Sequence, residues 1–333
     1  MVGHKVMDDL KIGTRDDRGN WKPNDDAEMA PLFSFPPKPM ALLKWLPQYF
    51  LPYNILFFVS AIVWWVLVVP PIEQMQTLQW GWTLKLFVVN LIAVILWYFA
   101  FEFRLYIRRA QDIRFKYNDK FPADRKSKRF WFESQNMENF LRTTLSGVPI
   151  WTGIQIVVLY AFANGWGATL DFQEDWALLL GLALIVPVIH EFHFYCIHRL
   201  IHHPILYKWV HSVHHKSVNP SPWSSLSMHP VEHVLYFSAV CYHLILPSHP
   251  MLAIYQIHIA GFGAVPGHIG FHKIELGEDT VMDSHAYIHY LHHRYFEVNY
   301  GDGLIPLDQW FGTFHDGSEE GQSKMRARLR NQS

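Results

Sequence analysis

The sequence predicts an all-α integral membrane protein, a bundle of about four transmembrane helices with a helical cap on the cytoplasmic side. Three observations support this fold class. The chain of 333 residues is 50% hydrophobic and only 17% charged, whereas soluble domains carry about 25% charged residues. Four apolar segments are long enough to lie in a bilayer, and the loops between them differ in charge. Nineteen of the 21 histidines fall between residues 190 and 293, mostly after the fourth segment.

Charge and cysteine content argue against a nucleic-acid-binding protein and against a disulfide-rich secreted protein. Lys and Arg number 28 against 29 Asp and Glu, so the charge gives no reason to expect nucleic acid as a partner. Two cysteines, Cys196 and Cys241, do not make a disulfide framework, and the sequence has no CxxC metal pair. The first forty residues contain no basic stretch leading into a short apolar core, so we expect no secretory signal.

The first two apolar segments are residues 54–70 and 82–103. The first has seventeen residues without a charge, near the lower limit for crossing a bilayer. Lys85 lies near one end of the second, where its ammonium can reach the interface. The loop 71–81 has no Lys or Arg, whereas 104–129 carries ten. Such charges suit any solvated face, but beside an apolar segment they also place this loop in the cytoplasm.

The third and fourth apolar segments are residues 148–168 and 177–195. Their connection, 169–176, has three acidic residues and no basic one, which fits the far side of the membrane. Four crossings return the chain to the cytoplasm just before His198. Four buried helices of a soluble protein are the alternative, but uncharged segment centres together with the loop asymmetry favour the membrane bundle.

These segments divide the chain into three parts. Residues 1–50 form a polar and mostly irregular N-terminal arm, 51–315 a membrane-embedded domain with histidine motifs at 198–293, and 316–333 a polar tail. Within the domain, the apolar stretch 234–265 is interrupted by histidines and prolines. We expect it to form two short helices at the membrane interface rather than further crossings.

Ten histidines after the fourth segment form four short motifs. HxxxH places two rings on one helical face, one turn apart. In HxxHH the first ring shares a face with the ring three residues on, and the adjacent ring can turn to a second ion. The motifs are His198 and His202; His211, His214 and His215; His268 and His272; and His289, His292 and His293. Ten imidazoles suit two metal ions with about five ligands each. Imidazole binds Zn, Cu, Fe or Ni, so the spacing does not identify the metal.

For the histidines outside these four motifs we expect mainly structural positions. His190 and His193 lie on the fourth segment, where we expect a polar face lining a substrate tunnel, with metal ligation as the alternative. His285 stands four residues before His289 and is an alternative ligand to His268 or His272. We expect interface positions for His243, His249 and His258, and surface positions for His4 and His315.

Several of these segments resemble the fatty acid hydroxylase and sterol desaturase superfamily of membrane enzymes. They are HRLIHH, HSVHHK, MHPVEH and HYLHHRYFEVNYGDGLIPLDQWFGTF, within a match over about residues 130–315 to which ESQNMENFLRTTLSG (133–147) also belongs. His211 follows His198 by only thirteen positions. Acyl-chain desaturases separate these motifs more widely, so the spacing favours the hydroxylase and sterol desaturase branch.

The resemblance implies a membrane-embedded catalytic domain in which two iron ions use O2 as co-substrate to hydroxylate, desaturate or oxidise a sterol or fatty acyl lipid. It implies catalytic and metal-binding roles for His198, His202, His211, His214, His215, His289, His292 and His293, and metal ligation by His268 and, least securely, His272. Residues that hold ligating rings through their other N–H are expected at Glu191, His229, Glu232, His233 and Asp283.

The electron source and location follow from further sequence features. The sequence has no HPGG-like haem-binding segment and no GxGxxG dinucleotide fingerprint, so we expect a separate carrier such as cytochrome b5 with its reductase. A multi-pass membrane enzyme of this kind is expected in the endoplasmic reticulum of a eukaryote, with its active site facing the cytoplasm.

A membrane metal-binding or transport protein without oxidative chemistry is the alternative function. Transporters place ionisable ligands near the bilayer midplane. The first three apolar segments here contain no histidine, which favours the oxidative enzyme.

Overall fold

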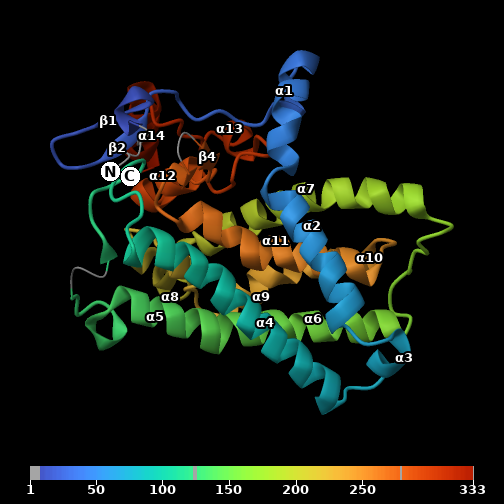
Figure 1. The fold of residues 1–333 in the computed structure, drawn as a ribbon. Helices are drawn as coiled ribbons and strands as arrows, with labels where there is room; N and C mark the ends of the chain where they lie inside the picture. Colours follow the sequence, from blue (N-terminus) through green and yellow to red (C-terminus); the bar gives the residue numbers. More distant parts are fainter. Residues whose placement is uncertain (1–7, 123–125, 278–279, 333) are drawn as a thin grey trace.

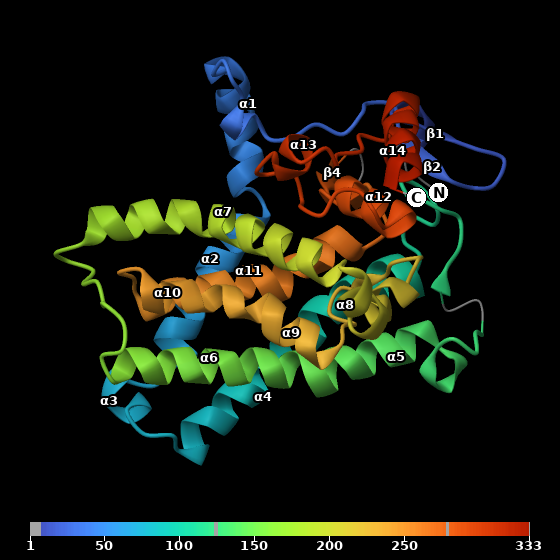
Figure 2. The ribbon, with the colours of Figure 1, turned by 180° about the vertical axis from the view of Figure 1, so that it is seen from behind.

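The computed structural model describes residues 8–122, 126–277 and 280–332. These residues form a mostly helical bundle with two small antiparallel hairpins (Figures 1 and 2), which confirms the predicted all-α membrane fold class. The longer helices are α1 (Pro39–Phe50), α2 (Tyr53–Val63), α4 (Trp80–Phe101), α5 (Gln135–Arg142), α6 (Val148–Ala163), α7 (Trp176–Ile201), α9 (Pro230–Phe237), α11 (Pro250–His268), α12 (Tyr287–Tyr295) and α14 (Glu319–Gln332).

Shorter elements connect the long helices. The short α-helices are α3 (Ile72–Met75), α8 (Pro204–Trp209), α10 (Tyr242–Ile245) and α13 (Leu307–Trp310). The π- and 3-10 segments are η1 (Asp9–Lys11), η2 (Pro31–Phe33), η3 (Trp64–Val68), η4 (Glu102–Ile107), η6 (Trp131–Glu133), η7 (Thr143–Gly147), η8 (His211–Lys216), η9 (Pro222–Ser224) and η10 (Ser238–Cys241). The strands are β1 (Gly13–Arg15), β2 (Trp21–Pro23), β3 (Lys273–Gly277) and β4 (Thr280–Asp283), paired β1 with β2 and β3 with β4.

Among the described residues, three continuous helices are long and apolar enough to cross a membrane. They run from Trp80 to Ile107, from Gln135 to Ala163 and from Trp176 to Ile201. Each contains most of a predicted apolar segment, and the middle one begins thirteen residues earlier than 148–168 because α5 and η7 continue directly into α6.

The first predicted crossing is not a single straight helix. The pair Pro39–Phe50 and Tyr53–Val68 bends by 42° at a short break and passes the length and hydropathy requirement only as a pair. Pro52 lies in the break and has no N–H with which to continue the helical ladder. In Figures 1 and 2, α1 consequently projects away from the bundle beside α7.

Helix α11 lies inside the bundle, so the prediction of two short interfacial helices over 234–265 was wrong. The helix packs against α2, α6 and α7 and buries side chains all around its circumference, as a helix without a polar face does. Pro266 lies inside α11 and cannot bond the carbonyl four residues earlier. That carbonyl, on Phe262, instead accepts a hydrogen bond from Trp97 Nε1 at 3.0 Å.

A cap covers one end of the bundle. The β1–β2 hairpin, α12, α13 and α14 gather there, while α3 and the α6–α7 connection lie at the opposite end (Figures 1 and 2). The N-terminal arm is therefore not irregular throughout. Trp21, 1% exposed, packs against Phe115 and Tyr117, and the backbone of Ala30 donates to Gly303 O at 2.8 Å.

Among the described basic residues of 104–129, Lys116 is fully buried. The Lys116 ammonium lies between 5.1 and 5.7 Å from the ring centroids of Tyr106, Phe121 and Phe271 and donates to Lys120 O at 2.8 Å. Burial lowers the pKa of Lys116 to about 7. This lysine anchors the loop to the cap by cation–π contact, so the loop is not simply a solvated charged face.

Candidate metal centre

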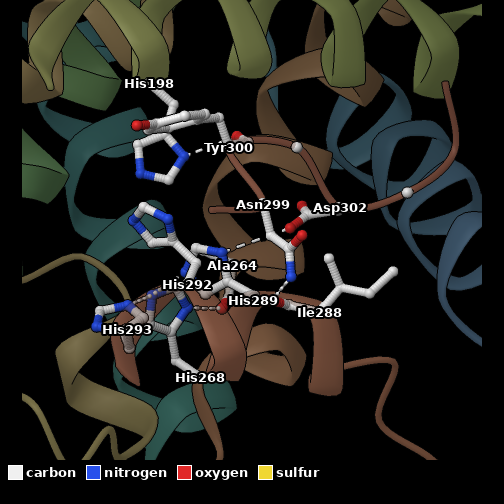
Figure 3. Close-up of polar contacts among 12 residues, drawn as sticks. His198, Ala264, His268, Ile288, His289, His292, His293, Asn299, Tyr300 and Asp302 are labelled. Atoms are coloured by element: carbon white, nitrogen blue, oxygen red, sulfur yellow. Dashed lines mark hydrogen bonds and ion pairs between the residues drawn. The ribbon is translucent and has the colours of Figure 1, made fainter. Parts of the chain in front are cut away.

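The first histidine motif closes α7. His198 and His202, 2% and 8% exposed, lie one turn apart with ring centroids 5.1 Å from each other. His198 Nδ1 donates to Tyr300 O at 2.7 Å (Figure 3). Because a neutral imidazole carries one proton, this bond leaves His198 Nε2 free to bind a metal.

The second motif forms the 3-10 helix η8. Residues three apart lie almost in line in a 3-10 helix, and the rings of His211 and His214 stack with centroids 5.5 Å apart. Lys216 ends the segment and places its ammonium 2.7 and 2.9 Å from the two carboxylate oxygens of Glu138 on α5. This buried carboxylate holds the segment against the bundle.

The last motif lies on α12, where His289, His292 and His293 are all buried. His292 Nδ1 donates to Val298 O at 2.7 Å, in the loop that follows the helix. Asn299 fixes this loop, because its Nδ2 donates to Ile288 O at 3.2 Å (Figure 3).

His268 is the last residue of α11, and its Nδ1 donates to Ala264 O at 2.8 Å (Figure 3). Its Nε2 therefore faces the other rings without a proton. The residue that should pair with it on a helical face, His272, follows after the helix has ended, since Gly270 takes a φ of +73°. HxxxH predicts a shared face only where the helix continues.

Nine of the ten predicted ligands converge in two groups. The five-histidine group contains His198, His202, His211, His215 and His292. The four-histidine group contains His214, His268, His289 and His293. Adjacent rings in each HxxHH motif divide between the groups, and the first ring joins the ring four residues on rather than the ring three residues on, which was expected to share its face. The segments 211–215 and 289–293 therefore contribute to both groups, whereas His198 and His202 belong only to the first and His268 only to the second.

The spacing of the ring nitrogens fits metal coordination. In the five-histidine group, Nε2 of His215 lies 3.0 to 3.3 Å from Nε2 of His211, His292 and His202. In the four-histidine group, Nε2 of His268 lies 3.0 to 3.2 Å from the Nε2 atoms of its neighbours. Nitrogens about 2.1 Å from one ion stand about 3.0–3.4 Å apart. Each group can therefore surround one ion.

His272 lies outside both groups, contrary to the expected tenth ligand. Its Nδ1 is 3.3 Å from the Tyr117 hydroxyl, and its ring packs against Trp21 with centroids 5.4 Å apart. The alternative, His285, is also outside: its side chain is 46% exposed and its Nδ1 lies 3.6 Å from Asp283.

Of the five residues expected to hold ligating rings, Glu232 contacts one directly. Its Oε1 accepts from His211 Nδ1 at 2.7 Å, with both side chains buried. His229 caps α9 by accepting from the Val231 N–H. His233 lies between Ser146 and Leu226, away from the ligand rings, and Asp283 accepts from His285 N.

Glu191 acts through the loop after α12. Its Oε1 accepts from the backbone N–H groups of Asp302 and Gly303 at 2.9 and 3.0 Å. Asp308 was not foreseen, and it accepts from the N–H groups of Tyr300 and Gly301 at 3.0 and 2.8 Å. Both carboxylates thus fix the segment whose carbonyl at Tyr300 orients His198. The sequence signal that could have identified Asp308 is the pair of acidic residues in the segment YGDGLIPLD.

Two further unforeseen residues touch the ligands. Asp302 Oδ1 lies 3.5 Å from His289 Nδ1 (Figure 3). Tyr207, on α8, packs its ring against His202, His211 and His215 with centroid distances of 5.4 to 6.1 Å. An HxxHH pattern carries no information about a neighbouring aromatic wall, so no sequence signal identified Tyr207.

Besides His233, six histidines of the described part of the chain are buried outside the two groups, whereas His203 is exposed. His190 packs on Phe194 and Tyr236, and His193 Nε2 is 2.9 Å from Leu235 O. The expected interface residues His243, His249 and His258 are 3%, 6% and 0% exposed, and His315 is 1% exposed rather than on the surface. His4 lies outside the described residues.

A small pocket of about 50 Å³ lies between the two groups. Rings of both groups line it: His198, His211, His214, His268 and His289. The rest of the wall is mostly apolar: Phe194, Ile197, Ile201, Met228, Tyr236, Gly263, Ala264 and Gly267, with Glu232 and Asp302 as its two acidic residues. The three small residues of α11 leave space beside the rings.

A larger groove of about 1260 Å³ opens between the N-terminal arm, α1 and the loops of the cap. Asp302 lines both the groove and the small pocket, and Glu191 and His272 also line the groove. The groove thus lies next to the site, between the cap and the projecting α1.

Burial keeps the ligand rings in the form that binds metal. It lowers the pKa of His211, His214 and His215 well below the ordinary value, and repulsion between neighbouring rings lowers it further. Neutral imidazoles without competing protons are the species that coordinate cations.

Residues 183–313 match the family model described as fatty acid hydroxylase. Among curated proteins, the chain is 34% identical over 148 residues to the Delta(7)-sterol 5(6)-desaturase ERG3B of Gibberella zeae, covering 42% of this chain and 44% of that protein. It is 27% identical over 180 residues to erg3A of Aspergillus fumigatus, covering 53% and 50%.

A Delta(7)-sterol 5(6)-desaturase of Candida glabrata is 28% identical over 183 residues, covering 52% of this chain and 48% of that protein. The chain thus spans about half the length of the curated relatives it matches. No solved structure matches it.

Proposed function

Since its histidine-bearing segment places the chain in the fatty acid hydroxylase and sterol desaturase superfamily, we propose that the protein is an O2-dependent di-iron oxidoreductase that oxidises a membrane lipid. The observation that carries this proposal is the pocket whose wall contains rings of both histidine groups. A carbon atom held there would lie next to rings of both groups, which would hold the two ions. The Delta(7)-sterols in the names of the relatives make a sterol the first substrate to test.

The donor set fits two iron ions. Five and four neutral imidazoles supply nitrogen ligands that suit iron, with coordination positions left for a small molecule. Iron bound there would supply the O2 activation that attack on an unactivated C–H bond requires. The protein orients the rings through Tyr300 O, Val298 O, Ala264 O and Glu232, which fix their tautomers.

The pocket wall provides substrate orientation and excludes water. Phe194, Met228 and Tyr236 give an apolar surface around the reacting position, which limits quenching of a reactive oxidant. The wall is built from the last turns of α7 and α11 and from α9, and these ends of α7 and α11 lie beside the cap (Figures 1 and 2). We expect a lipid to reach the wall from the membrane side. We place the cap end of the bundle in the cytoplasm, in the endoplasmic reticulum of a eukaryote, where a cytochrome b5-type carrier and its reductase deliver electrons.

The test is metal content and lipid product in the same preparation. Purified protein should hold close to two metal ions per chain and convert a sterol when iron and a reductant are supplied. His214→Ala and His292→Ala, one from each group, should lower metal content and abolish turnover. His249→Ala is the matched control, because His249 is equally buried but packs against Trp65 and Phe172, away from both groups.

A metal-binding or transport protein would give a different result. Cells expressing it would change their metal uptake without any change in lipid composition, and the purified protein would hold metal without forming product. A loss of metal in His249→Ala equal to that in the other two variants would show that the site has been assigned wrongly.

A further inference from the structure

Glu232 has one carboxylate oxygen that the metal centre does not use. The side chain is 2% exposed, and Oε1 accepts the hydrogen bond from His211 Nδ1 at 2.7 Å. Among the described residues, Oε2 has no hydrogen-bond partner and is closed off from solvent. A buried carboxylate oxygen without a donor is strongly unfavourable, so a donor must reach it in the working protein.

The wall of the small pocket does not supply that donor. The Tyr236 hydroxyl is committed to Ala260 O at 2.8 Å, and His268 Nδ1 to Ala264 O. His198 Nδ1 on α7 is committed to Tyr300 O at 2.7 Å, and the other lining residues of α7 and α11 are apolar side chains or glycines. Glu232 itself lines the pocket, so the donor comes from whatever occupies this space.

We propose that Glu232 Oε2 accepts a hydrogen bond from a hydroxyl group of the lipid substrate, which makes Glu232 a specificity-determining residue. This inference rests on the proposed function. Because the pocket is small and the same carboxylate holds a ligand of the five-histidine group, the hydroxyl lies only a few atoms from the carbon that is oxidised. The preferred substrate class is therefore a lipid with a hydroxyl near its reacting carbon, as in the ring system of a sterol.

Glu232→Gln separates the two roles of this side chain. The amide oxygen of glutamine can still accept the His211 N–H, whereas the reverse orientation would set two donors against each other. The amide NH2 then faces the pocket, so the group there changes from acceptor to donor while ring orientation is kept. Val234→Ala is the matched control, because Val234 lies on the outer face of the same helix and is 49% exposed.

The substrates to compare are a Δ7-sterol and its analogues with a ketone or with hydrogen in place of the hydroxyl. The wild type should prefer the hydroxysterol over the deoxy analogue by about 10- to 100-fold in kcat/KM, the size of one hydrogen bond to a charged group. Glu232→Gln should keep its metal, lose that preference and gain on the ketone, whose oxygen accepts from the amide. Val234→Ala should behave as the wild type.

Binding to metal-free protein gives a readout independent of turnover. The same order of Kd values, hydroxysterol tightest for wild type and ketone relatively improved for Glu232→Gln, is expected by displacement of a fluorescent sterol. Equal affinity of the wild type for hydroxysterol and deoxy analogue would overturn the inference and indicate a water molecule at Oε2. If the iron-loaded wild type oxidises no lipid, the proposed function fails instead, and the binding order still decides the role of Glu232.

Discussion

His268 and His272 form one sequence motif but lie in different environments, so replacing each by alanine gives opposite results. His268 Nε2 lies 3.0 to 3.2 Å from three other ring nitrogens. Its removal leaves three of four donors in that group. Loss of an outer-shell partner alone weakens metal binding by about 10- to 100-fold, and loss of a ligand exceeds that. His268→Ala should therefore fall from two metal ions per chain towards one and lose turnover.

His272→Ala should keep both ions. It removes one long hydrogen bond to Tyr117 and the ring contact with Trp21, which together cost about 1–3 kcal/mol of stability. Its expected phenotype is a lower midpoint of thermal unfolding with wild-type metal content and activity.

The assay is elemental analysis of purified protein after dialysis against a weak chelator, with a thermal melt of the same samples. His285→Ala serves as the exposed control and should change neither measurement. Loss of metal in His272→Ala to the same extent as in His268→Ala would refute the division into five and four ligands, and the ligand set would then need to be redrawn.

Three other predictions concern stability and topology. Glu138→Ala leaves Lys216 and Arg142 without their buried carboxylate, so the free energy of unfolding in detergent should fall by about 2–4 kcal/mol. Glu138→Gln should lower it less, and equal stability of Glu138→Ala and wild type would contradict the anchoring role. In the folded, metal-free protein the rings of His211, His214 and His215 stay neutral, whereas in the unfolded chain they take up protons below pH about 6.5. Because the unfolded state then binds more protons, the free energy of unfolding should fall as the pH drops below that value, by up to about 1.4 kcal/mol per pH unit for each ring. A stability that rises on acidification would oppose this. Glycosylation reporters near Gln76 and Glu174 should be modified and one at Lys126 should not; a modified Lys126 reporter would reverse the orientation.

Much of the clustering of histidines in the candidate metal centre was readable from the sequence, because the spacing within each motif is local. HxxxH at His198 lies at the end of α7, whose C-cap is His202, and HxxHH at His289 lies within α12, so the periodicity brought these rings to the same site. Within HxxHH it favoured His292 as the partner of His289, whereas His293 is the partner in the structure. The same rule gave the wrong neighbour at His272, because α11 ends at His268 and the chain turns at Gly270. Periodicity reports a helical face but not where the helix stops.

The buried positions were less accessible to sequence reasoning. The stretch 234–265 contains histidines and prolines, which argued for an interface. Polar groups of α11 nevertheless find partners inside the bundle: Ser60 Oγ lies 2.8 Å from His258 Nδ1, and Gln256 Nε2 lies 3.4 Å from His190 Nδ1. Such pairs join residues far apart in the chain. A single sequence shows polar residues but not the partners that allow them to be buried.

The same limit applies to the residues that orient the ligands. Glu232 was identified from its place in the HPVEH segment, whereas Asp308 and Tyr207 act through contacts that only the folded chain creates. Backbone carbonyls at Ala264, Val298 and Tyr300 have no side-chain signal at all.

The proposed function requires that the two histidine groups together carry out oxidation of a lipid by O2. The direct measurement is the stoichiometry of oxygen, electrons and lipid in the purified, iron-loaded protein supplied with a Δ7-sterol and a limiting chemical reductant. Hydroxylation and desaturation both consume one O2 and two electrons per lipid molecule, so the account predicts one oxidised sterol for each O2 taken up, and none in His292→Ala. Oxygen uptake without oxidised lipid, or equal product from metal-free protein, would contradict it.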